Sequence, residues 1–369
     1  MASGYRLDPA ALPEPFATFA AALIAEKRPV ADFVHLLETM AAKAKPRALV
    51  EYSAALRRAW PDHPLVHLRT GSLLASAVPG YHIPMITDEP RNRAYAEAIA
   101  AGIEPGMSVL EIGTGSGILA LLAARAGAAH VYTVEINPTM AAIARRNISA
   151  NGLGDRVTVI EANGLDLRIG ETLPCRCDAL VHELFGPMAV GESVLEILAH
   201  ARTHLMIDSS LLLPDQVEIW GQIDGAASRV PALTNICGLN LSELGLLDIG
   251  YGQIKHDHEL EALSAPTKLA NIDLNLDFEP GSAIEVPVRI TRDGDASAIV
   301  QWIGFRFPDG TVYRNPPGMA SHWRMVRTRF ARPATVRRGE TRDLAVHIET
   351  NYLWYELAEA PARQATGER

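Results

Sequence analysis

Cysteine and long apolar runs are scarce in this sequence of 369 residues. Three cysteines, Cys175, Cys177 and Cys237, make neither a disulfide framework nor a zinc site, so we expect reduced thiols in a cytoplasmic protein. No apolar segment approaches the length of a membrane span, and the N-terminus lacks the apolar core of a signal peptide. We therefore expect no membrane partner.

Positive charge is also scarce, since 34 Lys and Arg face 43 Asp and Glu, which gives a net charge of −9. This balance argues against a nucleic-acid partner and allows attraction to basic substrates. One cluster, His256, Asp257, His258 and Glu259, has residue types that bind metals. It stands alone in a polar stretch, so we interpret it as a solvated loop and predict no metal.

The first part of the chain, residues 1–80, is rich in Ala and Leu and is punctuated by prolines. Its apolar spacing predicts helices near 14–26, 30–43 and 47–60. The pattern is similar to paired helices of a degenerate tetratricopeptide type, with an incomplete signature, and the alternative is a plain helical extension that packs on the core.

The second part, residues 81–214, alternates strands with helices. This alternation is typical of an α/β fold with a doubly wound parallel sheet. The strands are predicted near 108–112, 130–136, 156–162 and 177–183, and a helix is predicted near 192–206.

The third part, residues 215–369, reads as antiparallel β structure. Strands are predicted at 216–223, 284–290, 298–307 and 344–348, with turns at Asp293-Gly294 and Asp309-Gly310. Residues 226–262 interrupt these strands with the sequence LTNICGLNLSELGLL, which favours a helical excursion.

The segment VLEIGTGSG indicates a nucleoside-binding loop after the first strand. Gly113, Gly115 and Gly117 permit a tight turn and a close approach of the backbone to a ligand. A dinucleotide fingerprint needs a third glycine three residues after the second, and that position is Ile118. Glu111 would repel a pyrophosphate and suits a cationic ligand. These features favour S-adenosylmethionine over NAD.

Two further features indicate the ligand and the substrate. Glu135 ends the next apolar strand, where a carboxylate can accept bonds from both ribose hydroxyls. Glu183 and Glu192 follow the fourth strand, and two converging carboxylates repel unless a cation lies between them. A planar guanidinium matches such a pair, although two glutamates in a loop are often only surface residues.

Several motifs occur together and in order: YHIPMITDEPRNRAY (81–95), the glycine loop, the Glu183/Glu192 loop and Ser321-His322-Trp323. In this combination the chain resembles the protein arginine methyltransferases over residues 81–357. The resemblance implies a Rossmann-like methyltransferase sheet that binds S-adenosylmethionine, a C-terminal β-barrel-like domain, and a dimerisation arm near 226–262 that makes a homodimer. The ending NYLWYEL is similar to that of the monomethylating branch.

The resemblance also implies a role for individual residues. Cofactor binding falls to His82, Arg91, Glu111, Gly113, Gly115, Gly117 and Glu135, with Arg91 on the cofactor's carboxylate. Catalytic roles fall to Met85, Asp88, Glu183, Glu192 and His322, with Asp88 paired to His322. Glu183, Glu192 and Trp323 would contact the substrate.

The sequence departs from the family pattern at three places. The aromatic segment expected before His82 is replaced by SLLAS (Ser72–Ser76), Ser321 stands where the family has Thr, and Leu165, beside Asp166, stands where an acidic adenine contact is common.

We therefore expect an arginine N-methyltransferase and favour free L-arginine over peptidyl arginine as the substrate. A protein substrate, a non-guanidine nucleophile and a scaffold without activity remain open, as does the choice between mono- and dimethylation. The His322–Asp88 pair is the expected proton relay, although Glu192 could accept the proton first.

Overall fold

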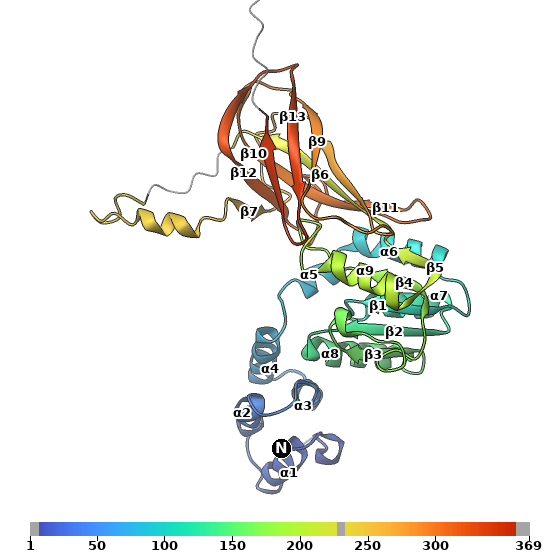
Figure 1. The fold of residues 1–369 in the computed structure, drawn as a ribbon. Helices are drawn as coiled ribbons and strands as arrows, with labels where there is room; N and C mark the ends of the chain where they lie inside the picture. The colour runs from blue at the N-terminus through green and yellow to red at the C-terminus, as the bar shows by residue number, and fades with distance from the viewer. Residues whose placement is uncertain (1–6, 227–232, 359–369) are drawn as a thin grey trace, which may run out of the picture. The chain divides into compact units, whose positions relative to one another are not determined.

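A computed structural model describes residues 7–226 and 233–358 of the chain (Figure 1). The chain divides into two compact units, Met1–Ile86 with Ile103–Cys175, and Thr87–Gly102 with Arg176–Arg369. Among the described residues, every helix falls short of the length and apolar character that a membrane span needs.

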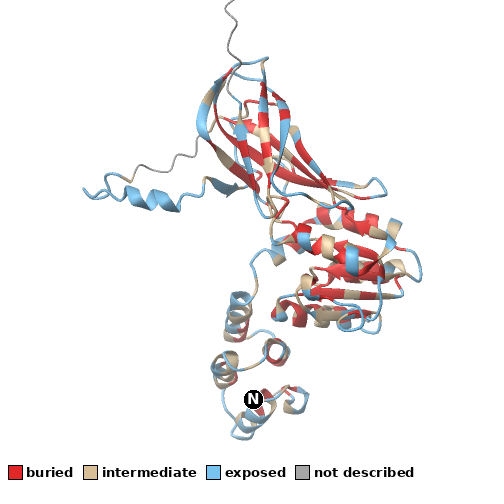
Figure 2. Cartoon of the chain, in the orientation of Figure 1, coloured by how far each residue is buried: buried red, intermediate tan, exposed pale blue. Residues whose placement is uncertain are grey.

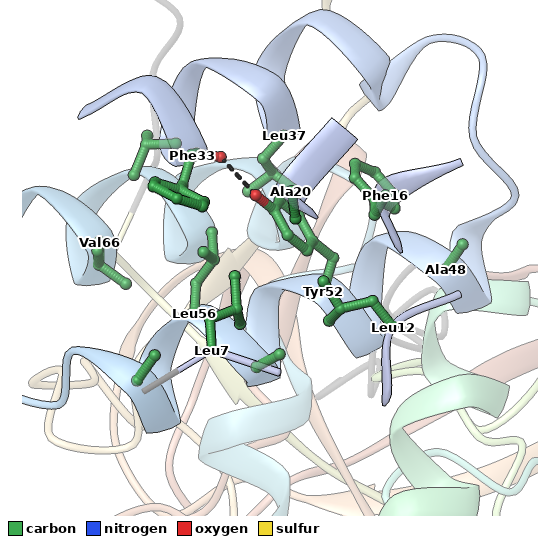
Figure 3. Close-up of a cluster of buried hydrophobic side chains, with 13 residues drawn as sticks. Leu7, Leu12, Phe16, Ala20, Phe33, Leu37, Ala48, Tyr52, Leu56 and Val66 are labelled. Carbon is green, nitrogen blue, oxygen red and sulfur yellow. Dashed lines mark hydrogen bonds between the residues drawn. The ribbon is translucent and has the colours of Figure 1, made fainter. Parts of the chain in front are cut away.

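The first unit begins with a helical module built from η1 (Pro9–Ala11), α1 (Phe16–Ala25), α2 (Val30–Ala41), α3 (Pro46–Ala59) and α4 (Pro64–Ser76). Its centre is a buried apolar cluster in which the rings of Phe16 and Tyr52 stack with centroids 4.3 Å apart. The Tyr52 hydroxyl donates to the Phe33 carbonyl at 3.0 Å (Figure 3). Each fully buried aromatic or leucine side chain contributes about 1.5–3 kcal/mol, so this cluster holds the module together.

Helix α4 was not predicted, and it ends with the SLLAS segment that replaces the family's aromatic residues. Helix α3 packs against α8 (Pro138–Ala150) of the same unit. Glu51 on α3 forms an ion pair of 2.5 Å with Arg146 on α8. The helical module is therefore attached to the α/β part of its own unit.

The α/β part of the first unit contains α5 (His82–Ile86), β1 (Ser108–Ile112), α7 (Ile118–Ala126), β2 (His130–Glu135), α8, β3 (Val157–Glu161) and η2 (Gly164–Asp166). Strand β2 pairs in parallel with β1 and with β3. Helix α8 begins after Asn137, whose side chain accepts bonds from the Thr139 and Met140 amides, and Pro138 supplies the first helical residue. The predicted strands of this region are confirmed to within one residue at each end.

The second unit supplies α6 (Glu89–Gly102), β4 (Cys177–His182), α9 (Val194–His204) and β5 (Met206–Leu213). The parallel sheet has the order β3-β2-β1-β4-β5, as expected for a doubly wound Rossmann-like fold. Strand β5 was not predicted because its exposed centre, Asp208 and Ser209, interrupts the apolar run.

The rest of the second unit is antiparallel, as predicted for a β-barrel-like domain. Its strands are β6 (Gln216–Asp224), β7 (Tyr251–Ile254), β8 (Thr267–Asp273), β9 (Ser282–Arg289), β10 (Gly294–Arg306), β11 (Val312–Arg314), β12 (Met325–Val336), β13 (Thr341–Ile348) and β14 (Leu353–Leu357). One sheet has the order β7-β12-β10-β6-β8, and the other has the order β14-β13-β9. Strand β10 is a central strand of the sheet β7-β12-β10-β6-β8 and is buried along most of its length (Figure 2).

The predicted helical excursion at 226–262 is only partly helical, and residues 227–232 lie outside the described residues. A short 3-10 helix, η3 (Ser242–Leu247), is the only helix in the described part of this segment, and strand β7 follows it. The helical excursion is therefore confirmed only over the six residues of η3, and Gly238, with a φ of +81°, lies in a turn before it. Figure 2 shows η3 as exposed, and Leu246 and Leu247 in it are 84% and 76% exposed.

Candidate functional site

The glycine loop lies between β1 and α7 in the first unit. Gly113, Gly115 and Gly117 have φ angles of +94°, +50° and +86°, in the left-handed region that favours glycine. A Cβ built on Gly115 would lie 3.5 Å from Cε of Met85 and 3.6 Å from Nδ1 of His82. The structure therefore brings His82 and Met85 of α5 beside this loop, and burial lowers the pKa of His82 so that a neutral imidazole is favoured.

Glu135 ends β2 on the same side of the unit as the glycine loop. One carboxylate oxygen accepts from the Gly115 amide at 2.8 Å, and the other accepts from the Asn137 amide at 2.8 Å. Burial raises the pKa of Glu135, and these backbone bonds oppose the shift. Because each carboxylate oxygen can accept a second bond, Glu135 remains able to receive the two hydroxyls of a ribose.

Glu111 is the final acceptor of a short chain of hydroxyl groups in the first unit. The Thr133 hydroxyl donates to Glu111, and the Thr114 and Thr133 oxygens are 2.5 Å apart. Since Thr133 gives its proton to the carboxylate, Thr114 is the donor in the second bond. Two acidic groups, Glu111 and Glu135, therefore flank the glycine loop, which fits a ligand with a ribose and a cationic centre better than a pyrophosphate.

The second unit holds the other sequence-predicted residues. Glu183 follows the last residue of β4, and its side chain is 7% exposed. Its carboxylate forms an ion pair of 2.9 Å with the Arg91 guanidinium on α6, which is 1% exposed. Arg91 was predicted to pair with the cofactor's carboxylate; in the structure its acidic partner is Glu183, and its contact with a cofactor stays a prediction.

The pKa of Glu183 reflects two opposed effects. Burial raises it, and the positive charge of Arg91 with its hydrogen bond lowers it, leaving the pKa above the usual value. Glu192 adds to the rise, because its negative charge acts on Glu183. Electrostatic repulsion between these two carboxylates is the expected property of a site that binds a cation between them.

Glu192 lies on a strained stretch of backbone between β4 and α9. Its φ angle is +51°, and those of Ala189 and Ser193 are +66° and +57°. Each such residue costs about 1–3 kcal/mol, so the conformation persists only where surrounding contacts impose it. The Glu192 side chain is exposed, which contrasts with the buried Glu183 on the same loop.

Asp88 accepts hydrogen bonds from several residues of the second unit. Its Oδ1 accepts from the Arg91 amide at 3.1 Å and caps α6. Its Oδ2 accepts from Nδ1 and the amide of His322, both at 3.0 Å, from the Ser321 hydroxyl at 3.0 Å and from the Tyr313 hydroxyl at 3.2 Å. Burial alone would raise the pKa of Asp88, but bonds from His322 and Arg91 lower it to about 2.

Trp323 was predicted to contact the substrate, but the residue is only 4% exposed. Its Nε1 donates to the Phe185 carbonyl at 2.8 Å, and its ring meets Phe305 edge-on with centroids 5.1 Å apart. This geometry favours a role in packing and in supporting the loop that carries Glu183 and Glu192. A contact of Trp323 with the substrate stays a prediction.

The interpretation of the 256–259 cluster as a solvated loop is wrong for His256, which is 7% exposed. Its Nε2 lies 2.6 Å from the Trp323 carbonyl oxygen, and its Nδ1 lies 3.2 Å from the Pro316 carbonyl oxygen. The other three members of the cluster are exposed. No group of three or more potential metal ligands occurs in the described part of the chain.

Sequence reasoning missed Tyr313, whose hydroxyl reaches both Asp88 and Ser321. It also missed Gln301, Asn351 and Tyr355, which bond to the acidic loop or to one another. Asn351 and Tyr355 belong to the NYLWYEL ending, but that motif did not indicate these contacts, because each partner is distant in the sequence.

Comparisons with known proteins bear on what these groups do. An arginine N(omega)-methyltransferase of Streptomyces achromogenes subsp. streptozoticus is 32% identical over 315 residues, which cover 83% of this chain and 86% of the relative. The chain belongs to the arginine methyltransferase family.

Other arginine methyltransferases show the same likeness over shorter lengths. Protein arginine N-methyltransferase 7 of Drosophila grimshawi is 32% identical over 246 residues, and this chain spans 34% of its length. The family model of ribosomal protein L11 methyltransferase (PrmA) matches residues 94–173, which hold the glycine loop and Glu135. The enzymes of this family use S-adenosylmethionine, as the glycine loop and its two carboxylates predict.

Solved arginine methyltransferases share the fold. The Trypanosoma brucei PRMT1 enzyme-prozyme complex with AdoHcy has a TM-score of 0.68, 22% identity, and coverage of 77% of this chain and 95% of that one. Arabidopsis thaliana protein arginine methyltransferase 10 has a TM-score of 0.63 and 21% identity, and the match covers 78% of this chain and 96% of that one. The predicted Rossmann-like and β-barrel-like architecture is confirmed.

Proposed function

We propose that this arginine methyltransferase moves a methyl group from S-adenosylmethionine to a terminal guanidino nitrogen of free L-arginine and releases omega-N-methylarginine. The observation that carries the proposal is the loop with one buried and one exposed carboxylate, Glu183 and Glu192, which act on each other electrostatically. The Streptomyces relative, 86% of whose length this chain spans, bears a name that specifies arginine itself, which supports the free amino acid.

The carboxylates and the Asp88–His322 pair have separate tasks in this proposal. S-adenosylmethionine supplies a methyl carbon bonded to a positively charged sulfur. Glu183 and Glu192 hold the guanidinium, favour positive charge on the nitrogens that face them, and leave the third nitrogen richer in electrons. Arg91 keeps Glu183 in place through their ion pair of 2.9 Å. Correct placement of the nitrogen supplies much of the rate gain.

One proton must leave when the methylated guanidinium forms. The His322 Nδ1 lies 3.0 Å from a carboxylate oxygen of Asp88, which can only accept, so Nδ1 carries the proton. Neutral His322 then has its lone pair on Nε2, which is the position from which it accepts the proton in the proposed relay.

The substrate is tested by incubating the purified chain with methyl-labelled S-adenosylmethionine and either L-arginine or an arginine-rich peptide. We expect label on L-arginine, recovered as the monomethyl product by chromatography. Label on the peptide alone would identify a protein arginine methyltransferase, and label on neither would favour the inactive scaffold. Dimethylated product would contradict the assignment to monomethylation.

The ribose role of Glu135 predicts a specific binding defect. Glu135→Ala removes both acceptors that face the proposed ribose, so affinity for S-adenosylmethionine should fall by about tenfold or more. Titration calorimetry measures this change, with Glu161→Ala at the exposed end of β3 as the control. Unchanged affinity in Glu135→Ala would remove this residue from the cofactor site.

We also propose that the exposed part of the predicted dimerisation arm, around η3 (Ser242–Leu247), contacts a second copy of this chain in a homodimer. Leu239, Leu246, Leu247 and Ile249 are between 62% and 84% exposed, and a run of exposed apolar side chains of this kind is typical of an interface. The paired change Leu246→Asp and Leu247→Asp should therefore give a monomer in light scattering. Leu68→Asp, at a leucine that is 65% exposed on α4, is the control. A monomeric unmodified protein would contradict the proposal.

A further inference from the structure

We infer that the hairpin of β13 and β14 holds the acidic loop 183–193 in its working shape, with Asn351 and Tyr355 as positioning residues. The inference rests on the proposed role of Glu192 in binding the guanidinium group. It concerns residues that do not touch the substrate but fix the backbone from which Glu192 extends.

The loop cannot keep its shape through its own bonds alone. Ala189, Glu192 and Ser193 all have φ angles in the left-handed region, between +51° and +66°. One turn bond lies within the loop, from the Ala189 amide to the Gly186 carbonyl, and another joins the Gly191 carbonyl to the Val194 amide at the start of α9. These bonds define local turns, but strain of this kind persists only where neighbouring structure imposes it.

Asn351 supplies such a restraint on both sides of Glu192. Its Oδ1 accepts from the Ser193 amide at 3.1 Å. Its main-chain oxygen lies 3.7 Å from where a Cβ on Gly191 would be, and Gly191 has a φ of +124°. The residues before and after Glu192 therefore both meet Asn351.

The position of Asn351 is itself fixed by the hairpin. Strands β13 and β14 are paired up to Ile348 and Leu353, and the Glu349 amide donates to the Tyr352 carbonyl at 3.0 Å to close the turn. Asn351 is thus at the tip of a regular antiparallel pair, which is a rigid element on which to place a restraint.

The same hairpin reaches the loop at a second point. The Tyr355 hydroxyl donates to Oε1 of Gln301 at 2.5 Å, and Nε2 of Gln301 donates to the Pro187 carbonyl at 3.4 Å. Gln301 is fully buried and Tyr355 is 5% exposed. Because the tyrosine bond orients the amide of Gln301, it turns the N–H group toward the loop.

These contacts separate two properties of Glu192. Its side chain is exposed and therefore accessible to a substrate, while Asn351 bonds to the adjacent Ser193 and Gln301 bonds to Pro187 earlier in the loop. Loss of a restraint should let the carboxylate point in several directions, which lowers turnover without any change in the cofactor site.

The test compares Asn351→Ala, Asn351→Asp and Tyr355→Phe with Asn275→Ala, an exposed turn asparagine after β8, as the control. Hydrogen exchange at residues 186–197 and kcat and KM, with the substrate that the unmodified protein methylates, are the readouts. In Asn351→Ala we expect amide exchange at Ser193 to rise by about tenfold, and kcat to fall by about tenfold. Affinity for S-adenosylmethionine should not change.

The aspartate variant identifies what Asn351 contributes. A carboxylate oxygen can accept the Ser193 bond, so Asn351→Asp should keep slow exchange and retain kcat within about threefold. Tyr355→Phe should give an exchange rate and a kcat between those of Asn351→Ala and Asn351→Asp. Equal loss of kcat in the Ala and Asp variants, with exchange slow in Asp, would mean that the amide N–H contacts the substrate and would overturn the positioning role.

Two other results would also overturn the inference. One is unchanged exchange at Ser193 in Asn351→Ala, and the other is faster exchange with unchanged kcat. A fully active Glu192→Gln variant would instead remove the proposed function of Glu192, while the exchange measurement would still report whether the hairpin restrains the loop.

Discussion

Glu183→Gln should remove detectable methyl transfer and lower the melting temperature, whereas Glu192→Gln should lower turnover with little change in stability. Both variants lose a negative charge that the proposed guanidinium site needs, and the loss of one such group typically costs about 10²–10³ in kcat. They differ in burial. Glu183→Gln leaves the Arg91 guanidinium, 1% exposed, without its ionic partner, and breaking a buried pair costs about 3–5 kcal/mol.

Initial rates and thermal unfolding separate these two effects, and calorimetry should find the S-adenosylmethionine affinity within a few-fold of the unmodified protein. The exposed Glu192 provides the matched variant, since a surface substitution changes stability by less than about 0.5 kcal/mol. Methylation by Glu183→Gln at the original rate would contradict the guanidinium site. Equal destabilisation by the two variants would contradict the difference in burial.

The pH dependence of the rate follows from the same ion pair. Burial raises the pKa of Glu183 above its usual value, and the Arg91 charge offsets only part of the rise. As the pH falls through this raised pKa, Glu183 takes up a proton and loses the charge that binds the guanidinium. Activity should therefore decline on the acid side before an exposed glutamate would be protonated, which a pH–rate profile measures.

The placement of Glu135 beside the glycine loop in the first unit could be predicted because these residues are close in sequence. The glycine loop and Glu135 lie at the ends of successive strands, and positive φ angles at Gly113, Gly115 and Gly117 are what alternating glycines permit. A parallel sheet then brings the ends of β1 and β2 together without further information.

The support of the acidic loop could not be predicted in this way. Gln301 and Pro187 are 114 residues apart, and Ser193 and Asn351 are 158 residues apart. Their contacts depend on the register of β10 and on the turn between β13 and β14, and single-sequence patterns do not specify either. The resemblance to a family indicated Glu192 and the NYLWYEL ending, but not that Asn351 and Tyr355 in this ending contact the loop or its supports.

Strand β12 shows why parts of the barrel-like domain were also missed. Its sequence contains Pro333, which cannot donate to a neighbouring strand and argues against a strand. In the structure the pairing with β10 passes from Ala334 directly to Arg329, so Pro333 lies in an irregularity of the ladder. A bulge accommodates the proline, and the strand continues on both sides.

Asp88→Asn should lower turnover by about a hundredfold or more and also destabilise the fold. Asp88 is the only acceptor that the described structure shows for Nδ1 of His322. An asparagine amide keeps one oxygen as an acceptor, and its NH2 group would face donors that now bond to the carboxylate. A lost hydrogen bond to a charged group costs about 1.5–3 kcal/mol. Asp309→Asn, in an exposed turn, is the control.

The stability effect of Asp88→Asn should depend on pH in a defined direction. The pKa of Asp88 is lowered from 3.8 to about 2, so its ionised form stabilises the folded state above pH 3.8, and this contribution is lost as the pH falls toward 2. The difference in free energy of unfolding between the two proteins should therefore be largest near neutral pH, roughly 2 kcal/mol from the shift alone, and should shrink below the unfolded pKa. Urea unfolding at several pH values measures it, and a difference that grows in acid would show that Asp88 does not receive these bonds as a carboxylate.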